Sequence, residues 1–332
     1  MQPTRHSRLQ FISIALAVFM LAVAPGCGSD EGGGGGAGGG ASGGSIAADS
    51  LKGASITVGS KEFTEQKVLG QITVLALKAA GADVKDETGL AGSVAARKAM
   101  LAGEIDMYWE YTGTGWLTHL KETKPIPDSM EQYQAVADRD LKENKIRWLD
   151  PAPANNTYAF AVKSESFDKL GVKTMSDFKT LAEQRPDDAS VCVGEEFTAR
   201  DDGLPGVHKT YGFEFPKITK IDEGLIYTET DKGADKDGKC NFGEVFITDG
   251  RIKANDLKII EDDKAFFPKY NPALNVRQEV VEKYPKIEEI FKPIAQKLDN
   301  ATLQTLNAQV DVEGLTEDEV AEQWLAEQGF TG

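Results

Sequence analysis

The sequence predicts an α/β fold in two domains, on the basis of three observations. The chain has 332 residues, which is enough for about two domains of ~100–200 residues each. Strand-like segments alternate with segments of helical periodicity, and a β-α-β-α-β order is typical of a parallel sheet flanked by helices. With 40% hydrophobic residues, each domain can bury a core of its own.

The first 26 residues have the composition of a signal peptide. Arg5 and Arg8 precede an apolar run at 11–24 that a single serine interrupts. Such a run is too short to span a ~30 Å hydrocarbon core comfortably. Residues 24–27 (APGC) resemble a lipobox, in which Cys27 is lipidated and becomes the mature N-terminus. The alternative is a plain secretory signal followed by an unrelated cysteine.

A glycine-rich segment follows the cysteine. Residues 28–50 contain eleven glycines and no large apolar residue except Ile46. This composition cannot form a core and is typical of a flexible tether. No Gly-Lys-Ser/Thr follows it, so it is not a phosphate-binding loop. We therefore expect residues 27–50 to be a lipidated cysteine and a tether.

The folded part is predicted to begin with three strands and two helices in alternation. The helix at 65–80 carries apolar residues four, three and four positions apart, which fits the 3.6-residue period, and Gly81 ends it. The other predicted elements are strands at 54–59, 83–88 and 105–108, and a helix at 93–101 that ends at Gly103.

The alternation resumes in the second half of the chain. The polar segment at 231–239 is predicted to be a surface loop, and the C-terminal part is mostly helical. Thr316 and Glu319 form a capping-box pattern ahead of the last helix, which Gly329 ends. The remaining predictions are strands at 157–162, 189–194, 217–221 and 243–248, and helices at 175–183 and 204–211.

Charge and motifs exclude several functions. With 53 acidic residues against 37 Lys and Arg, the net charge of −16 repels a phosphate backbone, so we expect no nucleic-acid partner. His6, His119 and His208 are scattered and form no metal-binding or catalytic set. No serine-nucleophile elbow and no His-Glu-x-x-His motif is present. The sequence therefore predicts no metal, no cofactor and no enzyme activity.

The cysteines are consistent with export. Beyond Cys27 only Cys192 and Cys240 remain, and exported chains form disulfides freely. Their spacing is not that of a metal site. We expect a disulfide between them; the alternative is two buried free thiols.

Residues that follow predicted strands are the candidates for binding, because open α/β sheets bind ligands at the carboxyl ends of their strands. Residues 59–65 (GSKEFTE) and 110–115 (EYTGTG) follow predicted strands, and residues 156–159 (NTYA) open the second half of the folded part. With several later stretches, they resemble the substrate-binding proteins of osmoprotectant ABC importers, of the glycine betaine/carnitine/choline type. The later stretches are EF at 196–197, RDDG at 200–203, TDGR at 248–251, DDK at 262–264, FFP at 266–268, YN at 270–271 and QVDVEG at 309–314.

The resemblance covers about residues 54–330 and implies a two-lobed periplasmic-binding-protein fold (type II-like) with the ligand in the cleft between the lobes. It places one lobe at 51–153 plus 265–332 and the other at 154–264. It also implies an extracytoplasmic, monomeric protein that delivers its ligand to separate ABC permease and ATPase subunits.

The resemblance further implies an aromatic cage for a quaternary ammonium ligand. The family's cage positions correspond to Tyr111, Tyr158, Phe246 and Tyr270. A trimethylammonium group has no N–H donor, so the negative faces of aromatic rings are its best partners. Phe246 stands where the family usually has tyrosine, which keeps the ring face and loses the hydroxyl. The alternative is that these rings belong to the cores of the lobes.

The polar end of the ligand is expected to meet Lys61, Thr114, Asn156 and Arg200. A carboxylate needs donors and positive charge, so glycine betaine is the favoured ligand, with carnitine or choline as alternatives. Two other interpretations stay open at this point. Lys61 could be a solvated loop lysine, and Arg200 could pair with Asp201 or Asp202 at the surface.

Two neighbouring features have structural interpretations. Trp109 lies beside the proposed cage and is either a cage wall or a packing residue, and Gly113 and Gly115 suggest a tight turn with close backbone approach. Two other functions remain to be compared with transport: a ligand-binding sensor or surface lipoprotein, and an enzyme on the same fold, against which the missing nucleophile–base motif argues.

Overall fold

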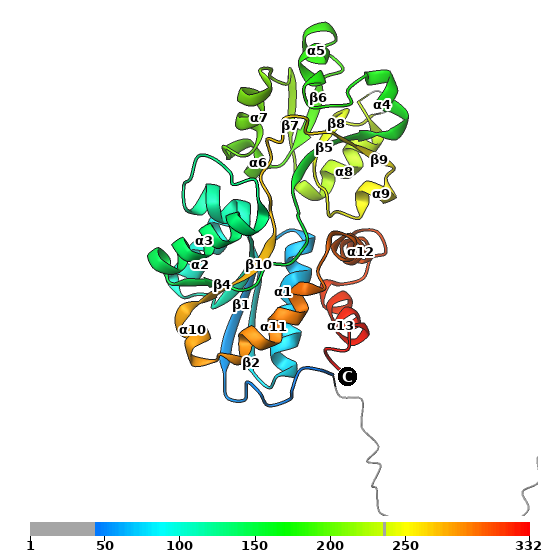
Figure 1. The fold of residues 1–332 in the computed structure, drawn as a ribbon. Helices are drawn as coiled ribbons and strands as arrows, with labels where there is room; N and C mark the ends of the chain where they lie inside the picture. Colours follow the sequence, from blue (N-terminus) through cyan, green and yellow to red (C-terminus); the bar gives the residue numbers. More distant parts are fainter. Residues whose placement is uncertain (1–43, 235–236) are drawn as a thin grey trace, which may run out of the picture. The chain divides into compact units, whose positions relative to one another are not determined.

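A computed structural model describes residues 44–234 and 237–332. The predicted signal peptide, Cys27 and the first part of the tether lie outside the described residues. The described chain forms two five-stranded sheets with helices packed on them (Figure 1). Within the described ranges, no helix has both the length and the apolar character needed to cross a bilayer.

The first sheet has the strand order β2-β1-β3-β10-β4. β1 pairs in parallel with β2 and β3, as predicted, whereas β10 runs antiparallel to β3 and β4. The sheet as a whole is therefore mixed, because β10 enters it from the second lobe and not through a crossover helix. The strands are β1 (Ser55–Lys61), β2 (Asp83–Leu90), β3 (Met107–Tyr111), β4 (Ile146–Trp148) and β10 (Pro272–Arg277).

Helices cover both faces of this sheet. On one face α1 (Thr64–Ala79) lies between the sheet and the C-terminal helices, so it is buried on more sides than the single apolar stripe predicted. The other face packs against the helix that follows β2 and the helix at 129–144. The covering helices are α10 (Gln278–Lys283), α11 (Lys286–Gln296), α12 (Asn300–Asp311) and α13 (Glu317–Glu327) on the first side, and α2 (Gly92–Ala102) and α3 (Ser129–Asn144) on the second.

The last helix has the predicted N-terminal cap. Thr316 accepts a hydrogen bond from the Glu319 N–H, and the Glu319 side chain accepts one from the Thr316 N–H, which completes the capping box of α13. Gly329 has a φ of +72°, a conformation that favours glycine, just after the helix ends.

The second sheet has the order β7-β6-β8-β5-β9. β6 is parallel to β7 and β8, and β5 is antiparallel to β8 and β9. Its strands are β5 (Tyr158–Lys163), β6 (Ser190–Val193), β7 (Lys217–Lys220), β8 (Phe242–Phe246) and β9 (Leu257–Ile260). Its helices are α4 (Ser164–Leu170), α5 (Asp177–Gln184), α6 (Glu195–Ala199), α7 (Leu204–Tyr211), α8 (Glu223–Lys232) and α9 (Arg251–Ala254).

The loop prediction at 231–239 needs one correction. α8 extends to Lys232, so Asp231 and Lys232 are helical. The helix continues there because residues 223–232 contain no proline and glycine stands only at its first turn and just after its end.

The chain passes between the two sheets twice, once between β4 and β5 and once between β9 and β10 (Figure 1). Each strand lies in the lobe to which the predicted limits, 51–153 plus 265–332 and 154–264, assign it. We keep these limits as a proposal for the lobe boundaries.

The region around β3 differs from its prediction in a way that matters for the site. The strand covers Met107–Tyr111 and not 105–108, and all five of its side chains are buried. A charged residue such as Glu110 usually indicates that a buried strand has ended, yet Glu110 is fully buried within β3. Residues 110 and 111 therefore end a strand instead of starting a loop.

The glycines after β3 lie in helical backbone and not in a tight turn. Gly113 has φ −63° and ψ −43°, directly before the short helix η1 (Thr114–His119). The close approach is present: a Cβ on Gly113 would lie 2.8 Å from the Tyr270 ring, and one on Gly115 2.5 Å from Trp148. Trp109 packs in the core of the first lobe, where its indole N–H donates to Thr73 Oγ1 at 2.9 Å.

The second lobe contains a disulfide between Cys192 in β6 and Cys240 just ahead of β8, with Cα atoms 5.6 Å apart. A bridge between residues 48 apart in sequence lowers the conformational entropy of the unfolded chain and so stabilises the folded state. We expect Cys192→Ala with Cys240→Ala to lower the free energy of unfolding by about 2–4 kcal/mol, measured by denaturant titration.

The bridge is also open to direct test. Alkylation of the denatured protein without reductant, followed by mass spectrometry, should leave Cys192 and Cys240 unmodified. The same protein treated with reductant first serves as the control. Alkylation of both thiols without reductant would contradict the disulfide.

Candidate functional site

The candidate residues lie together around one pocket. All eight side chains predicted to bind the ligand line it, although they come from both lobes and both crossing segments. Six further residues line it that the sequence prediction did not name as ligand-binding. The predicted eight are Lys61, Tyr111, Thr114, Asn156, Tyr158, Arg200, Phe246 and Tyr270, and the additional six are Glu62, Phe63, Gly92, Ser93, Glu196 and Glu223.

The aromatic residues of the pocket lie at strand ends, and their rings are neighbours. Tyr158 and Phe246 are register partners at the ends of β5 and β8, and their ring centroids are 5.0 Å apart. Tyr270 meets the Tyr158 ring edge-on at 5.4 Å. Phe63 stacks on Phe246 at 5.4 Å and on Tyr111 at 6.3 Å. Phe63 is thus a fifth ring of the group, and its place within the GSKEFTE stretch could have indicated it.

These rings also continue into the core of the second lobe. Tyr158 contacts Phe197 at 5.0 Å and Phe267 at 5.9 Å. Tyr111 and Tyr270, from first-lobe segments, join the same apolar cluster. The core and cage interpretations are therefore compatible, because the rings face the pocket on one side and the core on the other.

Glu65 connects the ring of Tyr111 to several parts of the chain. This carboxylate, only 3% exposed, accepts hydrogen bonds from Tyr111 Oη (2.7 Å) and Asn156 Nδ2 (2.8 Å). Thr248 Oγ1 (2.6 Å) and Asn307 Nδ2 (3.1 Å) donate to its other oxygen. Burial raises the pKa of Glu65, and the four donors act in the opposite direction. Asn156 Nδ2 thus donates to the same carboxylate oxygen as Tyr111 Oη, and this shared acceptor positions Tyr111.

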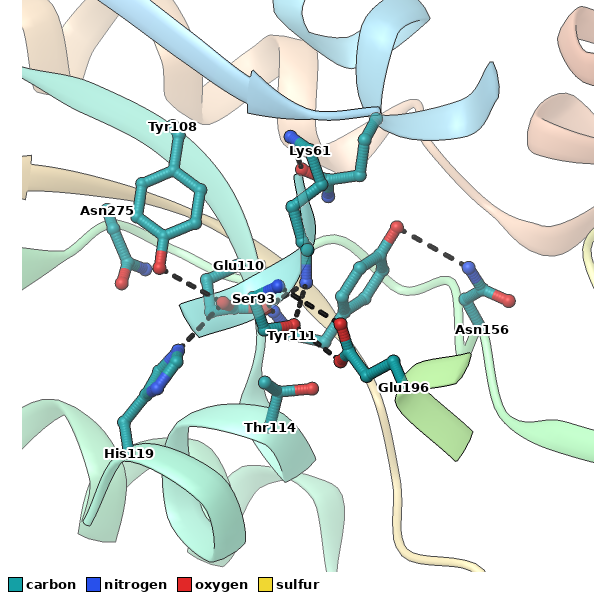
Figure 2. A network of polar contacts seen from close by, with 12 residues as sticks. Lys61, Ser93, Tyr108, Glu110, Tyr111, Thr114, His119, Asn156, Glu196 and Asn275 are labelled. Atoms are coloured by element: carbon teal, nitrogen blue, oxygen red, sulfur yellow. Dashed lines mark hydrogen bonds and ion pairs between the residues drawn. The ribbon is translucent and has the colours of Figure 1, made fainter. Parts of the chain in front are cut away.

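Lys61 is buried and paired, which excludes the solvated-loop interpretation. Its side chain is 3% exposed, and its Nζ donates to Glu110 Oε1 at 2.7 Å and to Ser93 Oγ at 3.1 Å. Figure 2 shows this ammonium between Glu110 and Ser93. The same Nζ lies 4.7 Å from the centroid of the Tyr111 ring, a cation–π distance.

Glu110 does not line the pocket itself. It lies at the centre of a buried network of hydrogen bonds and ion pairs (Figure 2). Besides Lys61, it accepts a hydrogen bond from Tyr108 Oη at 3.0 Å and lies 2.9 Å from His119 Nε2. Burial acts to raise the pKa of Glu110, but Lys61 and His119 outweigh it, and the pKa falls far below its ordinary value. Glu110 is therefore an anion that fixes Lys61 in place.

Arg200 makes four hydrogen bonds inside the pocket. Its guanidinium makes two hydrogen bonds to Asp202, one to Glu196 Oε1 (2.7 Å) and one to Thr114 Oγ1 (3.4 Å). Asp202 also accepts from Tyr270 Oη at 2.6 Å. The pairing of Arg200 with Asp202 is thus present, but both residues are buried and not at the surface. Despite burial, the surrounding acidic and tyrosine groups raise the pKa of Arg200 well above its ordinary value.

Two further acids lie at the second-lobe side of the site. Burial, together with the charges of neighbouring acidic residues, raises the pKa of Glu223 and of Glu244. Glu244 Oε2 accepts the Gly194 N–H at 3.0 Å. Of these two acids, only Glu223 is among the residues that line the pocket.

The site has the chemistry of binding. Aromatic faces and carboxylates suit a cation, and Arg200, Thr114 and Lys61 offer donors to an anionic group. Across residues 44–234 and 237–332, no group of three or more His, Cys, Asp or Glu side chains is placed to hold a metal ion.

Known proteins resemble this chain over most of its length. Residues 54–327 match the family OpuAC, described as the substrate binding domain of the ABC-type glycine betaine transport system. A glycine-betaine-binding protein of Pseudomonas aeruginosa is 38% identical over 86% of this chain and 91% of its own length. The glycine betaine-binding protein YehZ of Escherichia coli K12 is 33% identical over 85% of this chain and 93% of its own.

The fold agrees with that relationship. The solved structure of apo YehZ from Escherichia coli superposes with a TM-score of 0.62 at 32% identity, covering 83% of this chain and 99% of that one. Both relatives are named for binding glycine betaine, and the family is described as the substrate binding domain of a transport system. The chain therefore belongs to the substrate-binding proteins of glycine betaine-type ABC transport systems.

Proposed function

We propose that this protein captures a quaternary ammonium osmolyte, with glycine betaine as the favoured ligand and carnitine or choline as alternatives. The observation that supports this is the group of five rings around one pocket: Phe63, Tyr111, Tyr158, Phe246 and Tyr270. Each ring contributes about 0.5–2 kcal/mol to binding of a cation, and most when water is excluded. Calorimetric titration with glycine betaine, carnitine and choline tests the proposal, and no heat of binding with any of them would contradict it.

The carboxylate of the ligand is proposed to lie near Arg200, Thr114 and Lys61. Arg200 is in the second lobe and the other two are in the first, so a bridging carboxylate would stabilise the closed form. Choline has a hydroxyl in place of the carboxylate and cannot form the same charge-assisted hydrogen bonds.

Arg200→Ala is therefore expected to weaken glycine betaine about ten- to a hundredfold, because it removes about 1.5–3 kcal/mol of charge-assisted bonding. Choline should lose much less. Titration of both ligands into both proteins measures the ratio of their affinities. If Arg200→Ala leaves that ratio unchanged, the carboxylate of glycine betaine points to water, and the aromatic rings alone determine which ligand binds.

The protein is proposed to act outside the cytoplasm as a monomer, anchored by a lipid on Cys27. It would deliver its ligand to separate permease and ATPase subunits. Cys27→Ala is expected to move the protein from the membrane fraction to the soluble extracytoplasmic fraction, because a Gly-rich tether without lipid has no apolar surface to hold it. Immunoblotting of fractionated cells tests this, and the membrane-bound wild type is the control. Unchanged fractionation would contradict the lipid anchor.

A further inference from the structure

A carboxylate of the protein itself bridges the two lobes inside the pocket. Glu196 Oε1 accepts hydrogen bonds from Ser93 Oγ at 2.8 Å and from Arg200 Nη1 at 2.7 Å. Its Oε2 accepts the Ser93 N–H at 3.1 Å. Ser93 lies in the first turn of α2 in the first lobe, whereas Glu196 and Arg200 are in and just after α6 in the second. Figure 2 shows the Ser93–Glu196 contact beside Lys61.

The partners of Glu196 are those that a ligand carboxylate would need. Arg200 donates to Thr114 at 3.4 Å, and Lys61 donates to Ser93 at 3.1 Å, so the proposed carboxylate donors all border the position of Glu196. The N-terminus of α2 adds a backbone N–H and the positive end of the helix dipole. Although burial acts to raise its pKa, Lys61, Arg200 and the Ser93 N–H hold the pKa of Glu196 below its ordinary value.

Two carboxylates that pair with the cations of the pocket, Glu110 and Asp202, are less free to turn away than Glu196. Glu110 and Asp202 are 0% and 4% exposed, and each pairs with a cation of its own lobe. The Glu196 side chain is 27% exposed. It lines both the pocket and the wide cleft that borders it, so it can turn toward solvent without uncovering a core.

We propose that Glu196 is a resident anion that occupies the subsite of the substrate carboxylate and latches the lobes together when no substrate is bound. A zwitterionic substrate has to displace it from Ser93 and Arg200, whereas a cation without a carboxylate does not. This inference rests on the proposed function, because it takes the substrate to carry a carboxylate beside its ammonium group.

The first test uses two ligands and three proteins. Glycine betaine and choline are titrated into the wild type, Glu196→Gln and Glu195→Gln. Glu195 is the matched control, since it is the preceding residue of α6 and its side chain is 81% exposed. In Glu196→Gln the ratio of betaine affinity to choline affinity should rise about tenfold, the effect of one charge-assisted hydrogen bond. A ratio that stays the same or falls in Glu196→Gln overturns the proposal, and Glu195→Gln should not change it.

The ratio of betaine affinity to choline affinity separates the two proposed roles of Glu196, which are to latch the lobes and to occupy the carboxylate subsite. Loss of the latch alone would change both affinities by the same factor, whereas release of the carboxylate subsite changes only betaine. Glutamine keeps the shape of the side chain, and circular dichroism of each variant checks that it folds.

The second test needs no ligand. Small-angle X-ray scattering of the ligand-free proteins should give a larger radius of gyration for Glu196→Gln than for the wild type, and no change for Glu195→Gln. Equal radii for the wild type and Glu196→Gln overturn the latch. If glycine betaine, carnitine and choline all fail to bind the wild type, the proposed function has failed, and the scattering still decides whether Glu196 holds the lobes together.

Discussion

Replacing Tyr158 by Ala is expected to weaken the binding of glycine betaine by about tenfold or more. Tyr158 lies between Phe246 and Tyr270, with ring centroids 5.0 and 5.4 Å away. Its loss removes one aromatic face and lets water reach the cation. Tyr158→Phe keeps the face, so its affinity should stay close to that of the wild type. Calorimetric titration measures both.

A second variant separates binding from stability. Phe178 is a fully buried ring of the same lobe that contacts Phe160 and Phe242 but does not line the pocket. Phe178→Ala should lower the free energy of unfolding by about 3–5 kcal/mol and leave the affinity of the folded protein unchanged. Wild-type affinity in folded Tyr158→Ala would assign Tyr158 to the core and refute the cage.

Glu110→Gln is expected to lower the free energy of unfolding by about 3–5 kcal/mol, because it leaves the ammonium of Lys61 buried without its anion. Lys61 is 3% exposed and its second partner, Ser93, is neutral. Denaturant titration of both proteins measures the difference. Glu104→Gln, at an exposed position three residues before β3, is the control and should have almost no effect.

The difference in unfolding free energy between the wild type and Glu110→Gln should depend on pH. The pKa of Glu110 in the folded protein lies below its ordinary value of 4.5. A carboxyl group of this kind stabilises the fold fully above its unfolded pKa and loses the contribution as the pH falls through its folded pKa. The gap between wild type and Glu110→Gln should thus be constant above about pH 5 and shrink in stronger acid. A gap that widens in acid would contradict the ion pair.

The sequence predicted the pocket residues better than it predicted their partners. Short motifs place Tyr111, Tyr158 and Arg200 at the ends of strands or beside them, and that is a local property of the chain. The pairing of Lys61 with Glu110 and of Ser93 with Glu196 joins residues 49 and 103 positions apart. With 53 acidic residues in the chain, no spacing rule could select these two.

The fold was predictable where neighbouring segments form the sheet, and less so where distant ones do. β1, α1, β2 and α2 follow from periodicity and glycine stops, since they pack on one another in order. β10 joins the same sheet after the chain has built the second lobe, and short strands of this kind have no periodic signal of their own. The strand was predicted at 105–108, too early in the sequence, because the last two residues of β3 include the buried Glu110. The partner of that charge, Lys61, is far away in sequence.

The four hydrogen bonds to Glu65 bear on the rates of binding. They come from separate segments, and Thr248 belongs to the second lobe whereas Tyr111 and Asn307 belong to the first. Parting of the lobes would withdraw Thr248 and leave the carboxylate that anchors Tyr111 short of a donor, in surroundings where such a loss is costly. On the proposed function, release of a bound ligand would require the lobes to part, so the residence time would depend on a contact that the ligand does not touch. Substitution of Thr248 would then change the off-rate more than the on-rate.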